Sequence, residues 1–145
     1  MAGQREGTLP KVGIFACFSG GSNTGSLTGM AALEVVRRLG SDVAGVCSLP
    51  AVLSEVPRQS ALVKKMGKII VMDGCRNGCA RRLLAGVGIE PAIYLNLEED
   101  LGIVKRGPFT SLEFTAAEVQ AVADALVKVV QGGQGATDLG QKEVQ

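Results

Sequence analysis

The four cysteines of this chain are the residues best suited to chemistry, and two of them lie four positions apart. Cys75 and Cys79 belong to the stretch 73–80, DGCRNGCA, which follows one short apolar run. Cys17 and Cys47 lie upstream, each at the end of another apolar run. Thiolates bind Zn²⁺ and iron–sulfur clusters and attack electrophiles. Cysteines that gather in one place therefore indicate a metal site or a reactive thiol.

The rest of the sequence favours free thiols over structural disulfides. Residues 1–7 are polar and lack the apolar core of a signal peptide, and no apolar run reaches the ~20 residues that span a bilayer. We therefore expect a cytoplasmic protein without membrane association, in a compartment that keeps thiols reduced. There is no histidine, which excludes Cys-His nucleophile pairs and mixed Cys/His zinc sites.

Length and composition predict one domain. The chain has 145 residues, of which 46% are hydrophobic, enough to bury a core. We expect a single domain over 11–131, between a mobile lead-in at 1–10 and a disordered polar tail at 132–145. A net charge of +1 and only 3% aromatic residues argue against nucleic acid as a partner.

Apolar runs alternate with amphipathic segments, and this alternation predicts an α/β fold. We expect a three-layer Rossmann-like sandwich, in which a mostly parallel sheet of about four strands carries helices on both faces. The strands are expected at 11–16, 42–46, 68–72 and 92–97, and the helices at 26–39, 57–66, 78–85 and 115–131.

Local signals refine this prediction at three places. Thr115 and Glu118 have the spacing of a capping box, which marks the start of the last helix. Residues 49–51, with a proline in the middle, interrupt the pattern after the second strand. Residues 98–109 are expected to be irregular, because two glycines and a proline break them.

The predicted strands would bring the cysteines together. Ligands bind beyond the carboxyl ends of strands in an open parallel sheet. Cys17 and Cys47 end the first two strands, Cys75 follows the third, and Cys79 lies in the first turn of the next helix. If the strands are neighbours, all four thiols lie at one edge. The amides and dipole at a helix start favour thiolate over thiol.

Plainer interpretations apply to individual residues. Cys47 alone, after a glycine and a valine, is typical of a small buried hydrophobe. The loop that contains Gly20, Gly21 and Ser22 lies between a strand and a helix, where phosphate loops occur, but it lacks the Gly-Lys-Ser/Thr ending. It either makes a tight turn, binds an anion, or donates amides to cysteine sulfurs. Asp73 either joins the site or caps the next helix.

The motifs as a set resemble the DGC-domain family, named for a central Asp-Gly-Cys. The resemblance extends over about residues 11–130 and rests on Cys17 with SGGS at 19–22, on CSLPA at 47–51, and on DGC at 73–75 with Cys79. It implies that Cys17, Cys47, Cys75 and Cys79 bind zinc, and it leaves the biological role open.

Three functions follow as hypotheses. The first is a metal-binding domain with a four-cysteine site, for zinc or alternatively an iron–sulfur cluster. The second is a redox or sulfur-handling enzyme, in which Cys75 or Cys79 is the nucleophile and another cysteine resolves a disulfide or persulfide. The third is a binder of small anions or nucleotides through the loop at 19–26.

Overall fold

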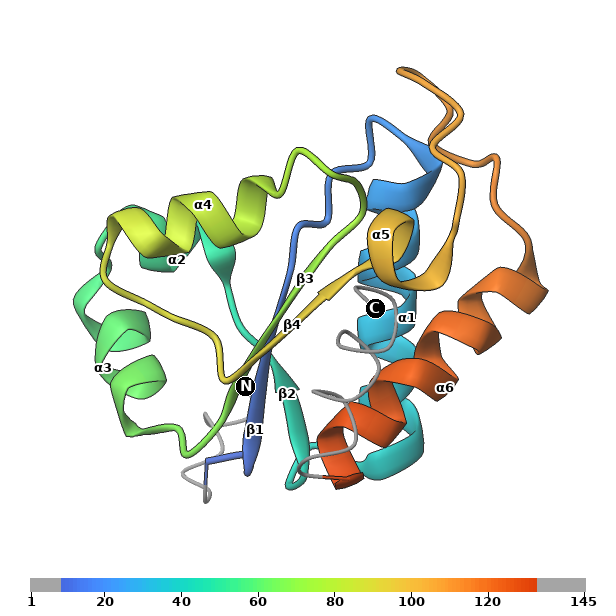
Figure 1. The fold of residues 1–145 in the computed structure, drawn as a ribbon. Helices are drawn as coiled ribbons and strands as arrows, with labels where there is room; N and C mark the ends of the chain where they lie inside the picture. The colour runs from blue at the N-terminus through green and yellow to red at the C-terminus, as the bar shows by residue number, and fades with distance from the viewer. Residues whose placement is uncertain (1–8, 133–145) are drawn as a thin grey trace, which may run out of the picture.

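A four-stranded parallel sheet forms the centre of the computed structural model, which describes residues 9–132 (Figure 1). The strand order is β2-β1-β3-β4, and all three pairings are parallel. The strands are β1 (Val12–Ala16), β2 (Ala44–Val46), β3 (Ile69–Asp73) and β4 (Ile93–Asn96). All carboxyl ends therefore lie at the same edge of the sheet, and the predicted α/β class is confirmed.

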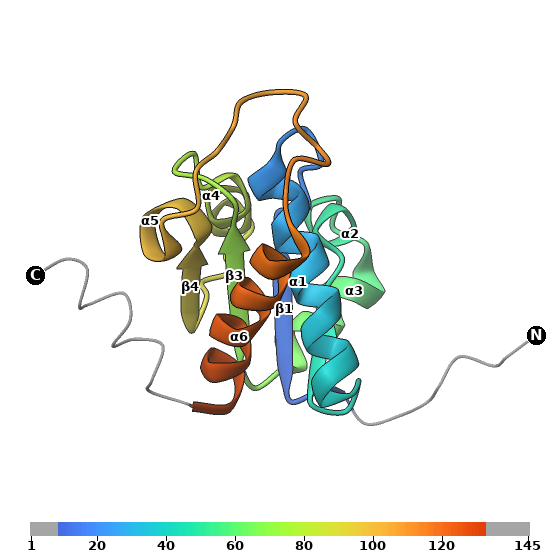
Figure 2. The same cartoon turned by 90° about the vertical axis from the view of Figure 1, so that its right-hand side faces the viewer.

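Helices cover both faces of this sheet, as the view in Figure 2 shows. One face carries α1 (Asn23–Leu39) and α6 (Ala116–Gly132), and the other carries α2 (Leu49–Leu53), α3 (Pro57–Lys65) and α4 (Cys79–Gly86). A short helix, α5 (Leu97–Leu101), follows β4 directly. The predicted three-layer sandwich is confirmed.

The two cores follow from the alternation of side chains along β1. Ile14 and Ala16 point into the core under α1 and α6, whereas Phe15 points into the core under α2, α3 and α4. All three side chains are almost completely buried. Cys17, the next residue, shares the face of Phe15 and packs against the second core. The period of the strand therefore decides which helices Cys17 can meet.

Several local predictions are confirmed, and others are wrong. The capping box is present, because Thr115 Oγ1 accepts from the amide of Glu118 at 3.0 Å and Glu118 accepts from the amide of Thr115 at 2.9 Å. Residues 49–51 do not interrupt the structure but begin α2, because Ser48 caps that helix and accepts from the amide of Ala51. Pro50 fits there because the first helical turn needs no amide donor at that position.

The region 98–109 is also partly helical. Asn96 caps α5 through its side-chain oxygen, which accepts from the amides of Glu98 and Glu99, and the segment after Gly102 is irregular as expected. α1 begins three residues earlier than predicted, since Ser22 is its N-cap. Within residues 9–132, no helix has the length and apolar character needed to cross a membrane. Most of the predicted lead-in and tail lies outside the described residues.

Candidate functional site

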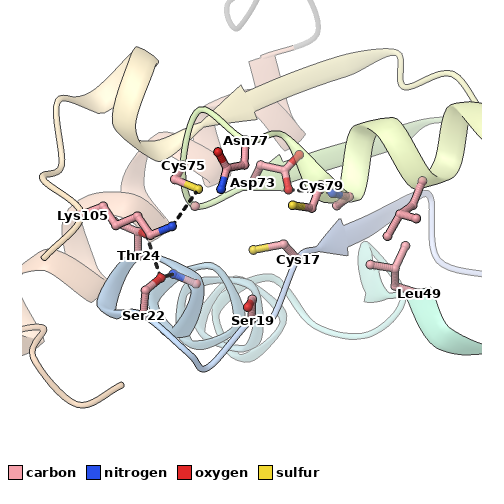
Figure 3. Close-up of a pocket in the computed structure, with 14 residues that line it drawn as sticks. Cys17, Ser19, Ser22, Thr24, Leu49, Asp73, Cys75, Asn77, Cys79 and Lys105 are labelled. Atoms are coloured by element: carbon pink, nitrogen blue, oxygen red, sulfur yellow. Dashed lines mark hydrogen bonds between the residues drawn. The ribbon is translucent and has the colours of Figure 1, made fainter. Parts of the chain in front are cut away.

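A cavity of about 280 Å³ lies at the carboxyl edge of the sheet, where β1, the loop after β3, α1 and α4 meet. Three of the four cysteines line it, and their side chains point into it (Figure 3). Cys17 comes directly after β1, Cys75 lies in the loop between β3 and α4, and Cys79 is the first residue of α4. Three separate elements therefore each deliver one thiol to the same cavity.

Cys47 does not line this cavity. Its sulfur lies 3.7 Å from the sulfur of Met66, at the end of α3, and the side chain packs against the second core. Burial raises the pKa of Cys47 to about 11, although a backbone hydrogen bond at Ile14 opposes the rise. Such a thiol stays protonated near neutral pH. Cys47 is half-buried and packs against a core, which agrees in part with the interpretation as a small buried hydrophobe.

The donor chemistry of the cavity fits a thiophilic metal ion through three cysteines. Among residues 9–132, however, no three or more cysteine or carboxylate side chains already form a group that could hold a metal ion. The predicted set of four stays a prediction, and it would also require the Cys47 thiol to leave its contact with Met66. Coordination by Cys17, Cys75 and Cys79 requires their sulfurs to draw closer together.

Asp73, the last residue of β3, accepts hydrogen bonds from the first turn of α4 beside the cavity, whereas Gly78 is the N-cap residue of that helix. Asp73 is 2% exposed, and its two oxygens accept from the amides of Ala80 at 2.8 Å and Arg81 at 3.1 Å. The hydroxyl of Tyr94 donates to Asp73 Oδ2 at 3.0 Å, and burial raises the pKa of Tyr94, so this hydroxyl keeps its proton. Of the two predicted roles for Asp73, the helix cap is the one that the hydrogen bonds support.

Gly74 allows the loop after β3 to touch the first turn of α1. A Cβ atom at Gly74 would lie 2.6 Å from the carbonyl carbon of Thr24 and 2.8 Å from the amide nitrogen of Gly25. Real Cβ contacts are essentially never that short, and the clashing atoms are backbone. The Asp-Gly-Cys motif thus combines a helix cap, a close backbone contact and a thiol that reaches the cavity.

The loop that carries Cys75 is also tied to the end of β4. The side-chain amide of Asn96 donates to the carbonyl oxygen of Cys75 at 2.8 Å. Glu98 accepts from the amide of Arg76 at 3.0 Å. These contacts hold the backbone on both sides of the peptide bond that follows Cys75.

Lys105 is a residue of the cavity that the sequence analysis did not single out. It lies on the segment between α5 and α6, and its ammonium group donates to Cys75 Sγ at 3.5 Å (Figure 3). The residue lies 30 positions after Cys75, in a stretch expected to be irregular. No local pattern connects the two, so only the fold could reveal the contact.

The Gly- and Ser-rich loop has a structural task. The carbonyl oxygen of Gly21 accepts from the amide of Phe109 at 2.7 Å, and that of Gly20 accepts from Ser111. Neither glycine lines the cavity, whereas Ser22 does and also caps α1. These contacts hold the α5–α6 segment over the carboxyl edge, and they favour the tight-turn interpretation over an anion site.

Fold and site together define a class: a three-layer α/β domain with a thiol-lined cavity at the carboxyl edge of a parallel sheet. The sequence pattern of the DGC domain matches residues 13–126, and the chain belongs to this family. The match runs from β1 into α6 and includes all four cysteines, which confirms the resemblance seen in the sequence. No curated protein and no solved structure matches the chain.

Proposed function

We propose that this protein binds a thiophilic metal ion, Zn²⁺ in the first place, through Cys17, Cys75 and Cys79. The observation that carries the proposal is the convergence of three thiols, from three different elements, on one cavity. Thiolate sulfur is the ligand that zinc takes in most sites without histidine. Membership of the DGC family adds support, since the resemblance implies zinc binding by the cysteines.

A four-cysteine site remains the alternative arrangement for the same ion. It requires Cys47 to break its contact with Met66 and to leave the core under α2, α3 and α4. A zinc site with four cysteines is coordinatively closed, whereas three protein ligands keep one position for an external ligand. We favour three ligands because Cys47 is the one cysteine that does not line the cavity.

Metal analysis tests the proposal. Protein purified without chelator should contain about one zinc per chain by elemental analysis, and Cys75→Ser should lose it. A result of no bound metal in the wild-type protein, and none after titration with Zn²⁺, would sink the proposal. Visible absorbance from bound iron and sulfide would assign the site to an iron–sulfur cluster instead.

A thiol-based redox or sulfur-transfer activity is the second candidate. It is favoured by the contact between Lys105 and Cys75, because an adjacent ammonium group stabilises a thiolate. In this function the Cys75 thiolate attacks one sulfur of an external disulfide and displaces the other as a thiolate. Cys17 or Cys79 then attacks the mixed disulfide, forms an internal disulfide with Cys75 and releases the second thiolate. Alkylation of metal-free protein discriminates the two functions. A Cys75 that reacts no faster than a free cysteine would argue against the enzyme.

A further inference from the structure

We infer that Lys105 gives the cysteine cavity a preference for ions whose complex with three thiolates carries a negative charge. The inference rests on the proposed metal binding. It assigns a specificity-determining role to a residue outside the Cys motifs. The starting point is the distance of 3.5 Å between Lys105 Nζ and Cys75 Sγ.

Among the described residues that line the cavity, Lys105 is the one with a cationic side chain. The other charged lining residue is Asp73, whose oxygens are engaged by the α4 amides and by Tyr94. Within residues 9–132, Lys105 has no carboxylate partner, and its ammonium group donates to the Cys75 sulfur alone. The positive charge of Lys105 can therefore act on a complex that an ion forms with the thiolates.

The backbone around Lys105 is held on both sides by one buried side chain. Asn23, which is 0% exposed, donates to the carbonyl oxygen of Val104 at 2.9 Å and accepts from the amide of Arg106 at 2.8 Å. The backbone amide of Asn23 donates to Thr110 Oγ1 at 3.0 Å. The start of α1 therefore holds the backbone of Lys105 in place, and the side chain of Lys105 reaches the cavity from there.

Charge counting shows which ions Lys105 would favour. Zn²⁺ with three thiolates has a net charge of −1; three S–H bonds break, their protons go to solvent, and three Zn–S bonds replace bonds to water. Trivalent arsenic forms a neutral complex. Arsenous acid, As(OH)₃, exchanges three As–O bonds for three As–S bonds and releases three waters, with no change in oxidation state. The ammonium group attracts the first complex and not the second.

The test compares Zn²⁺ and arsenite on the full chain, reduced and metal-free, by competition titration. Lys105→Gln should bind Zn²⁺ about tenfold more weakly, since a charge-assisted contact is lost. Its affinity for arsenite should be unchanged. Lys105→Arg should restore zinc affinity. Arg106→Gln is the matched control. It removes a positive charge one position after Lys105, from a residue that does not line the cavity, so the affinities for both ions should stay unchanged.

Each other outcome overturns something specific. An equal loss of both ions in Lys105→Gln would show that Lys105 only supports the structure. Unchanged zinc affinity in that variant would end the inference and leave the proposed metal binding intact. If the wild-type protein bound zinc but not arsenite, the three thiols would not all be accessible to one ion, and the inference depends on that accessibility. Failure of the wild type to bind either ion would overturn the proposed function and the inference together.

Discussion

The sulfur of Cys47 lies 3.7 Å from the sulfur of Met66, and Cys47 does not line the cavity that the other three cysteines share. The register of the sheet explains this. Ile14 pairs with Val46, so one further step places Cys47 level with Phe15, two residues before Cys17. At about 3.3 Å per residue, Cys47 is about 7 Å short of the level of Cys17. Its sulfur also lies near Gly13, whose added Cβ would come within 2.9 Å of it.

The first prediction concerns the pH dependence of stability. Because burial raises the pKa of Cys47 from 9.0 to about 11, the folded state favours the neutral thiol. The resulting stabilisation is fully present below pH 9 and is lost as the pH rises toward 11. The free energy of unfolding, measured with urea between pH 8 and 11, should fall more steeply for the wild type than for Cys47→Ala. Parallel curves for the two proteins would show that Cys47 does not contribute.

A second prediction concerns the glycine of the Asp-Gly-Cys motif. Gly74→Ala should lower the free energy of unfolding by about 1–3 kcal/mol, because the new Cβ meets the backbone of Thr24. Gly86→Ala is the matched control at the end of α4, where an added Cβ has nothing within 4 Å. That variant should be as stable as the wild type, or more stable by up to about 1 kcal/mol. Urea denaturation that finds both variants equally stable would contradict the close contact.

The third prediction concerns the cap of α4. Asp73→Ala removes the acceptor of two helix amides and of the Tyr94 hydroxyl, and should cost about 2–4 kcal/mol. Tyr94→Phe removes only the hydroxyl and should cost about 1 kcal/mol. Thermal or urea unfolding of both variants measures the difference. If Tyr94→Phe lowered the free energy of unfolding more than Asp73→Ala, the bonds from Asp73 to the α4 amides would contribute less than the account requires.

Much of the fold could be predicted because its signals are local. The alternation of apolar and amphipathic segments indicated every strand, and the Thr115–Glu118 spacing indicated the start of α6. The bonds from Asp73 to the start of α4 span a longer loop, of seven and eight positions, but their direction also follows from an aspartate just before a helix. The strands and the start of α6 depend on residues a few positions apart, so a sequence pattern is enough to predict them.

The parts that could not be predicted depend on contacts between distant residues. The position of Cys47 follows from the register between β1 and β2, and a sequence pattern places strand ends only to within a residue or two. The contact of Lys105 with Cys75 depends on Asn23 holding the α5–α6 segment at the start of α1. The sequence of one segment alone therefore predicts neither the position of Cys47 nor the contact of Lys105 with Cys75.

The most direct test of the proposed site compares the zinc content of two serine variants. Cys79→Ser removes a thiol that lines the cavity, whereas Cys47→Ser removes the thiol that contacts Met66. Both proteins are purified without chelator and analysed for metal per folded chain. We expect Cys47→Ser to keep about one zinc and Cys79→Ser to lose it. Loss of zinc from both variants alike would contradict the three-cysteine site and would show that Cys47 is a ligand.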